Sequence, residues 1–178
     1  MKWHCSLLSV LILMYSCQNA KPPFVKLESS KTNITFNNKL HETHTYNYFT
    51  YPYMYLGGGV AVGDINNDGL EDLYFTGNMV PNKLYLNKGA MKFEDISMSA
   101  GVEGDERWFS GVTMIDINQD GYLDIYCAVG GKNEPNENVL YINNGNNTFS
   151  EKAKEYGIAD NGYSMHSTFF DYDKDGDL

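Results

Sequence analysis

The chain has 178 residues, of which 42% are hydrophobic and 20% are charged, so its composition excludes an intrinsically disordered protein. The formal net charge of −10 argues against a nucleic-acid partner, because an acidic surface repels phosphate backbones. Fourteen Tyr, nine Phe and 17 Gly favour an all-β fold, since aromatic residues are enriched in strands.

The first segment of the chain, residues 1–16, is predicted to be a signal peptide. An apolar run over 7–14 is too short to span a bilayer, which needs about 20 residues. The small residue and Cys17 that follow resemble a bacterial lipobox, in which the Cys becomes the lipidated first residue. Met14 and Tyr15 depart from the usual pattern, so ordinary secretion with an unmodified Cys17 stays the alternative. We expect an exported protein, lipid-anchored to a bacterial membrane at the outer membrane or cell surface.

The three cysteines do not form a disulfide framework in this interpretation. Cys5 leaves with the signal peptide and Cys17 carries lipid, which leaves Cys127 alone in a strand-like run. We expect Cys127 to be a small buried hydrophobic residue. A secreted protein without disulfides needs another source of stability, and bound metal is a candidate.

Residues 17–56 are predicted to be an N-terminal arm or linker outside the repeats, which supplies either an extra strand or a covering segment. Five tyrosines alternate along it, which predicts one aromatic face that packs rather than binds sugar. They are Tyr46, Tyr48, Tyr51, Tyr53 and Tyr55.

An internal repeat begins after the arm. Residues 59–74 align with 111–126, and a third copy occupies 167–178. The first Asp of each copy is Asp64, Asp116 or Asp171, which gives spacings of 52 and 55 residues. The predicted repeats span 57–108, 109–164 and, in part, 165–178.

Each repeat is predicted to hold four short strands, which in the first copy cover 59–63, 73–76, 83–87 and a weaker piece around 92–95. The residues over 97–107 are expected to form a loop or a short helical turn. Four strands in a period of about 50 residues are typical of a β-propeller blade. We therefore predict an all-β fold of propeller blades.

The acidic loop D-x-N-x-D-G-x-x-D occurs twice, between the first two predicted strands of each full repeat. Its predicted metal ligands are side-chain oxygens at positions one, three, five and nine, and the carbonyl oxygen at position seven. They are Asp64, Asn66, Asp68, Leu70 and Asp72 in the first loop, and Asp116, Asn118, Asp120, Tyr122 and Asp124 in the second. Asp171, Asp173 and Asp175 form a partial third site.

Calcium suits these loops, because Ca²⁺ takes six to eight oxygen ligands and alternate positions of a tight loop can converge on one point. An EF-hand would need Glu at position twelve, where the loops have Phe75 and Cys127. Mg²⁺ is disfavoured because it rarely uses an all-protein cage. The remaining alternative is that the Asp, Asn and Gly residues only make polar turns.

The repeat resembles the FG-GAP/VCBS repeats of integrin-α-type propellers. The run over 57–69, Gly-Gly-Gly-Val-Ala-Val-Gly-Asp-Ile-Asn-Asn-Asp-Gly, is similar to bacterial ASPIC/UnbV-type relatives of cartilage acidic protein. The resemblance covers about residues 55–178 and implies a propeller, typically seven-bladed, with calcium in hairpins along one rim. The chain then holds about two and a half blades and is truncated at its C-terminus.

The function expected from these features is a calcium-binding lipoprotein that binds a protein or glycan ligand at the cell surface. The alternative is a propeller-based carbohydrate-active enzyme whose catalytic residues lie in the missing part. No catalytic cluster is predicted here: His41, His44 and His166 are scattered, and no nucleophile elbow or phosphate loop occurs. We therefore expect no enzyme activity and no nucleic-acid partner.

Overall fold

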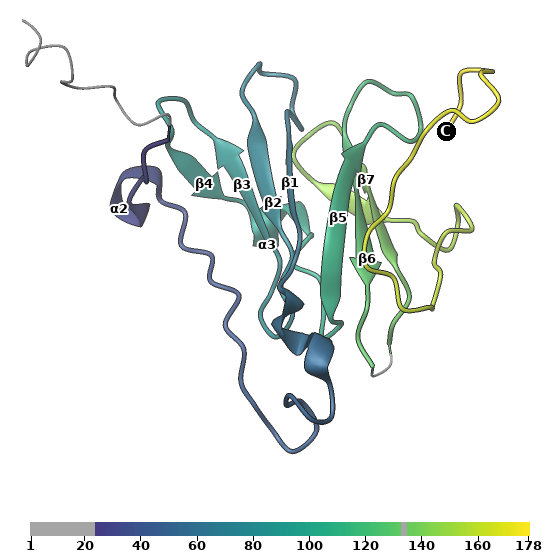
Figure 1. Ribbon diagram of the computed structural model, residues 1–178. Helices are drawn as coiled ribbons and strands as arrows, with labels where there is room; N and C mark the ends of the chain where they lie inside the picture. The colour runs from purple at the N-terminus through teal and green to yellow at the C-terminus, as the bar shows by residue number, and fades with distance from the viewer. Residues whose placement is uncertain (1–23, 133–134) are drawn as a thin grey trace, which may run out of the picture.

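The computed structural model of the chain describes residues 24–132 and 135–178. The predicted signal peptide and Cys17 lie outside these residues. Two four-stranded antiparallel sheets stand side by side, each with its strands in sequence order, and a long N-terminal arm runs along the first sheet (Figure 1).

The first sheet follows the predicted strand pattern closely. It contains β1 (Val60–Gly63), β2 (Asp72–Phe75), β3 (Lys83–Asn87) and β4 (Phe93–Asp95). Side chains alternate across β2, so that Asp72 and Tyr74 are buried between the sheets while Leu73 and Phe75 face away from the second sheet. The short helix α3 (Ser97–Ala100) follows β4, as the sequence predicts for this connection.

The second sheet repeats the first. It contains β5 (Phe109–Ile115), β6 (Asp124–Val129), β7 (Val139–Asn143) and β8 (Phe149–Glu151). Its first strand, β5, is longer than β1 and has a register shift between Phe109 and Gly111. No strand follows β8 within the described residues.

The first strands of the two sheets, β1 and β5, lie beside one another and are called the innermost strands below. A Cβ atom at Gly59 would stand 2.8 Å from the backbone nitrogen of Val112, so only glycine allows this approach. Gly111 makes the equivalent contact with the third repeat, where a Cβ would stand 3.2 Å from the Cα of His166. The Thr113 hydroxyl donates to the carbonyl of Ser167 at 2.8 Å along the same line. This succession of innermost strands is the arrangement of propeller blades.

The main core lies between the two sheets. Tyr74, Leu84 and Ile125 have no exposed surface there, and the Tyr74 hydroxyl donates to the carbonyl of Val102 at 2.7 Å. Cys127 is fully buried against Tyr74, and burial raises the pKa of its thiol to about 12. The prediction of a small buried hydrophobic residue at Cys127 is confirmed.

The N-terminal arm covers the outward face of the first sheet without adding a strand to it. The arm contains α2 (Ser29–Thr32) and a 3₁₀ helix, η1 (Pro52–Leu56). Phe36 stacks on Phe75 with 5.1 Å between the ring centroids, and the backbone N–H of Thr35 donates to the hydroxyl of Tyr85. The covering role is therefore the one observed.

The alternating tyrosines do not share one face. Tyr46 stacks on Trp108 at 5.2 Å and Tyr51 is buried against the same indole, whereas Tyr48 and Tyr53 are exposed. Alternation requires an extended chain, but a turn in which Thr50 and Tyr51 donate N–H groups to the carbonyl of Asn47 interrupts it, and η1 follows from Pro52. No helix in the described ranges has the length and apolar character needed to cross a membrane.

Candidate metal centres

The three acidic loops project from the same edge of the molecule, at the top of Figure 1. The first connects β1 to β2, the second connects β5 to β6, and the third follows the segment that lies along β5. The first two loops leave the innermost strands β1 and β5, and the third leaves the segment that packs along β5, so this repeated packing places the loops in a row.

The first Asp organises each loop by accepting backbone N–H groups. Asp64 accepts from Asp68 at 3.1 Å and from Gly69 at 2.7 Å. Asp116 accepts from Asp120 at 3.0 Å and from Gly121 at 2.9 Å. The glycines have φ of 83° and 89°, a conformation that side chains rarely adopt. The predicted turn geometry is thus present in both loops.

The side chain at position three also points into the loop. The amide oxygen of Asn66 accepts the N–H of Asp68 at 3.2 Å, while its Nδ2 donates to the Asp68 carboxylate at 3.1 Å. Asn118 and Asp120 repeat both contacts, at 3.1 and 2.9 Å. Positions one, three and five therefore gather their oxygens within one turn.

The ninth position is buried and anchored. Asp72 has no exposed surface, and its two carboxylate oxygens accept the N–H groups of Ile65 at 3.0 Å and Asn87 at 2.7 Å. Burial raises the pKa of Asp72, and the nearby Asp68 and Asp64 carboxylates add to that rise, while the two backbone N–H groups lower it.

Asp124 reproduces this arrangement in the second loop. It is also fully buried, it accepts from Ile117 at 3.1 Å and from Asn143 at 2.8 Å, and burial raises its pKa. Among the described residues, neither Asp72 nor Asp124 has a basic ion-pair partner. A buried carboxylate without a counter-charge is costly, and each of its oxygens keeps a lone pair for a cation. The donor set therefore fits a hard metal ion.

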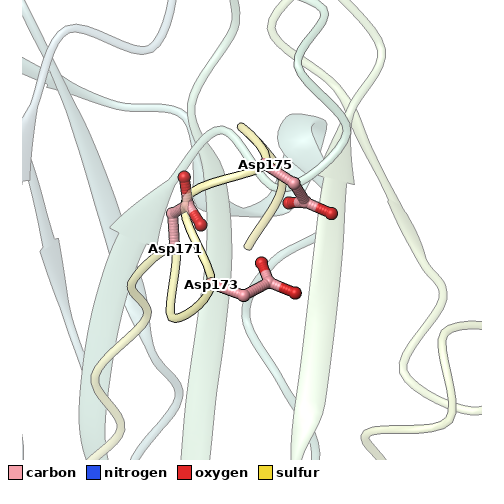
Figure 2. A group of neighbouring side chains, drawn as sticks. All are labelled: Asp171, Asp173 and Asp175. Carbon is pink, nitrogen blue, oxygen red and sulfur yellow. The ribbon is translucent and has the colours of Figure 1, made fainter.

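The third loop brings three carboxylates together (Figure 2). Oxygens of Asp171, Asp173 and Asp175 all lie within 4.8 Å of one another. Two oxygens that share one Ca²⁺ at 2.3–2.6 Å stand at most about 5 Å apart, so this spacing fits a common ion. It is the one such cluster of acidic, His or Cys side chains within 24–132 and 135–178. Position nine of this loop would lie beyond Leu178.

The first two loops differ from the third because they have Asn at position three and because no three of their carboxylates lie within 4.8 Å of one another. Their sites would combine two outer carboxylates, one amide oxygen, one carbonyl and one anchored carboxylate. His41, His44 and His166 take part in no cluster among the described side chains.

Two site residues escaped the sequence analysis. Asn87 and Asn143 end β3 and β7, and their N–H groups hold Asp72 and Asp124. The side chain of Asn143 also donates to the carbonyl of Ile65 in the first loop at 2.8 Å. The repeated segment Asn-x-Leu-Tyr-x-Asn, over 82–87 and 138–143, is the signal that marks them.

Comparison with known proteins agrees with this repeat. The sequence profile described as FG-GAP-like repeat matches residues 64–127 and 116–178, and each match starts on the first Asp of an acidic loop. The chain belongs to the FG-GAP-like repeat family. The match confirms the resemblance drawn from the loops. The two four-stranded sheets are therefore β-propeller blades.

Relatives of the chain that share these repeats include two animal proteins. The chain is 36% identical over 130 residues to cartilage acidic protein 1 of Xenopus tropicalis, which covers 70% of the chain and 19% of that protein. It is 33% identical over 105 residues to integrin alpha-8 of Gallus gallus, covering 51% of the chain and 10% of that protein. The chain thus spans about a fifth or less of these relatives.

Proposed function

We propose that the chain is a calcium-binding, exported and lipid-anchored propeller module that binds a protein or glycan ligand at the cell surface. The observation that carries the proposal is the repeated acidic loop, in which a buried carboxylate without a counter-charge stands behind two outer carboxylates. Likeness to integrin alpha-8 supports a binding or adhesion role rather than an enzymatic one.

Calcium is the proposed ion because the loops offer carboxylate, amide and carbonyl oxygens and no nitrogen or sulfur ligand. In the first loop these are Asp64, Asn66, Asp68, the Leu70 carbonyl and Asp72. A bound cation would offset the burial of Asp72 and the repulsion among its acidic neighbours. It would also supply stability in place of disulfides, because Cys127, the one cysteine within 24–132 and 135–178, is free and buried.

The proposed ligand surface is the end of the blades opposite the acidic loops. Asp124 and Val129 are the two ends of β6, so the loop at Asp124 and the residues after Val129 lie at opposite edges. A pocket of about 570 Å³ opens at the second edge, between η1, the residues after β6 and the start of the third repeat. It is lined by Thr50, Tyr51, Pro52, Tyr53, Gly130, Lys132, Tyr163 and Met165.

The lining of this pocket suits recognition rather than catalysis. Tyr53 and Tyr163 are largely exposed and present rings that can stack on a sugar or an apolar side chain. Lys132 is fixed by the carbonyl of Thr45 and lies 5.2 Å from the ring centre of Tyr46. None of the described residues that line the pocket carries a carboxylate.

Calorimetric titration of the chelator-treated chain with CaCl₂ tests the metal assignment. We expect about two sites per chain, one for each complete loop, and a weaker third. In the variant Asp64→Ala/Asp116→Ala, the heat from the two complete loops should disappear. Glu94→Gln removes an exposed charge from β4, outside the loops, and should titrate like the native chain. Absence of calcium heat in the native chain would reject the proposal.

Lipid anchoring is tested separately, by expression in a bacterium with a labelled fatty acid. The native chain should carry label in the membrane fraction, and Cys17→Ser should lose both the label and the membrane association. A Cys17→Ser variant that keeps the label would contradict this part of the proposal.

A further inference from the structure

Neighbouring acidic loops are joined by a side-chain hydrogen bond at the same place in each. The Nδ2 of Asn67 donates to the carbonyl of Gly121 at 2.9 Å, and the Nε2 of Gln119 donates to the carbonyl of Gly176 at 2.6 Å. The donor is position four of one loop and the acceptor is position six of the next. Two different side chains thus make one contact at equivalent positions.

The backbone at position four supports this contact. Asn67 and Gln119 have φ of 60° and 59°, in the left-handed region. This conformation is unfavourable for a residue with a Cβ atom, and more so for Gln than for Asn. Lys174, at position four of the third loop, has φ of 66° as well, so this conformation belongs to the loop itself, and from it Asn67 and Gln119 reach the following loop.

The acceptor is well placed to influence the next metal site. Gly121 directly precedes Tyr122, whose N–H donates to the Asp120 carboxylate at 2.9 Å and whose carbonyl is the predicted ligand at position seven. Because a peptide unit is planar, holding the Gly121 carbonyl fixes the orientation of the unit that joins these two residues. Asn67 therefore constrains the backbone that leads to a ligand of the second loop.

Asn67, the donor, is also placed so that metal binding in the first loop would affect it. Asn67 stands between Asn66 and Asp68, which are predicted ligands at positions three and five. Binding of an ion by those two side chains would restrict the residue between them. A second contact, from Asn143 of the second blade to the carbonyl of Ile65, ties the first loop to the same neighbour.

We propose that the position-four side chains couple neighbouring metal loops, so that an ion in one loop raises the calcium affinity of the next. Asn67 is the positioning residue for the second loop and Gln119 for the third. The inference rests on the proposed calcium function of the loops. Since coupling between two binding sites is reciprocal, occupation of the second loop also raises the affinity of the first.

Nuclear magnetic resonance of the ¹⁵N-labelled chain resolves the loops, because each has one glycine amide bonded to its first Asp: Gly69, Gly121 or Gly176. Titration with CaCl₂ gives an apparent Kd for each amide. In Asn67→Gly, which keeps the left-handed backbone free of strain, we expect the Kd at Gly121 to rise about fivefold, the equivalent of one hydrogen bond. Because the coupling is reciprocal, the Kd at Gly69 should also rise, by no more than the same factor.

Gln119→Gly is the matched control, since it makes the same kind of change one blade further on. It should weaken binding at Gly176 and leave Gly69 unchanged. Asp64→Ala, which removes the first site, should raise the Kd at Gly121 in the native background but not in Asn67→Gly. An unchanged Kd at Gly121 in Asn67→Gly, or a change confined to Gly69, would overturn the coupling.

A readout without metal separates this inference from the proposed function. In chelator, amide hydrogen exchange at Gly121 should be about fivefold faster in Asn67→Gly than in the native chain, with Gly69 unaffected. If no glycine responds to calcium, the proposed function fails, and equal exchange rates at Gly121 would overturn the coupling on their own.

Discussion

The two blades have nearly the same strand pattern, yet their equivalent faces have different neighbours. In the second blade, Ile125 and Cys127 face the first sheet and are fully buried. In the first blade, the matching residue Phe75 is covered by Phe36 of the arm and stays partly exposed. Val60, on the same face, is 56% exposed. The comparison teaches that burial in a blade is decided by what stands next to it.

The opposite faces of the two blades, which carry Tyr74 on β2 and Tyr126 on β6, also differ in their neighbours. Tyr74 of the first blade and Tyr126 of the second each donate a hydroxyl hydrogen bond to the residue after a Gly turn, at 2.7 and 2.9 Å. Tyr74 lies under a complete second sheet, whereas Tyr126 meets Phe169 of a segment that forms no strand. The two equivalent tyrosines are therefore packed differently, Tyr74 by a sheet and Tyr126 by a segment without a strand.

The largest expected difference concerns thiol reactivity at the matched positions 127 and 75. Since the pKa of Cys127 is raised to about 12, its thiol stays protonated and unreactive through pH 9. At pH 8 its alkylation by iodoacetamide should be on the order of a thousand-fold slower than in the urea-unfolded chain. Label is located by peptide mass spectrometry.

The control for this prediction places the thiol on the other blade. In Phe75→Cys/Cys127→Ser, the new thiol stands on the partly exposed face and should react at least tenfold faster than Cys127 in the native chain. Equal rates would show that the two faces are covered alike.

The next effect concerns the paired tyrosines. Tyr74→Ala should destabilise the chain by about 3–5 kcal/mol, because it opens a cavity between two packed sheets. Tyr126→Ala should cost at least about 1 kcal/mol less, because one of its faces has only loop segments as cover. Urea unfolding followed by circular dichroism measures both, and equal losses would contradict the comparison.

The smallest effect concerns the asparagines that hold the ninth-position acids. Asn87→Ala removes side-chain bonds to Glu71 and Gly89 within its blade. Asn143→Ala removes the equivalent bonds to Leu123 and Gly145 and, in addition, the bond to Ile65 of the first loop. We expect Asn143→Ala to cost about 1 kcal/mol more. The same unfolding experiment in chelator measures it, and a larger loss for Asn87→Ala would reverse the assignment.

Much of the fold could be predicted because the same strand and loop residues recur at the same spacing in both repeats. The sequence predicts β3 at its observed bounds, since the Asn-x-Leu-Tyr-x-Asn segment and the glycine after it recur at matching offsets in both repeats. The turn at Gly69 and the buried role of Cys127 follow from local chemistry in the same way. These features depend on residues close in sequence.

Features that depend on distant contacts could not be predicted. The stacking of Phe36 on Phe75 and the bond from Asn67 to Gly121 join segments that share no local pattern. The anchoring of Asp72 by two backbone N–H groups likewise requires β3 to be in place beside the loop. The tyrosine alternation misled because a turn at 47–51 and a 3₁₀ helix from Pro52 interrupt the extended chain, and the period-two pattern reveals neither.

The central claim is that calcium in the acidic loops stabilises the blades, and its most direct test is a thermal melt with and without calcium. At a calcium concentration a hundred times Kd, each occupied loop adds about 2.7 kcal/mol, so two loops should raise Tm by about 10–20 °C. Asp64→Ala/Asp116→Ala should lose most of this rise, and Glu94→Gln should keep it. An equal Tm in calcium and in chelator for the native chain would mean that the loops are only polar turns.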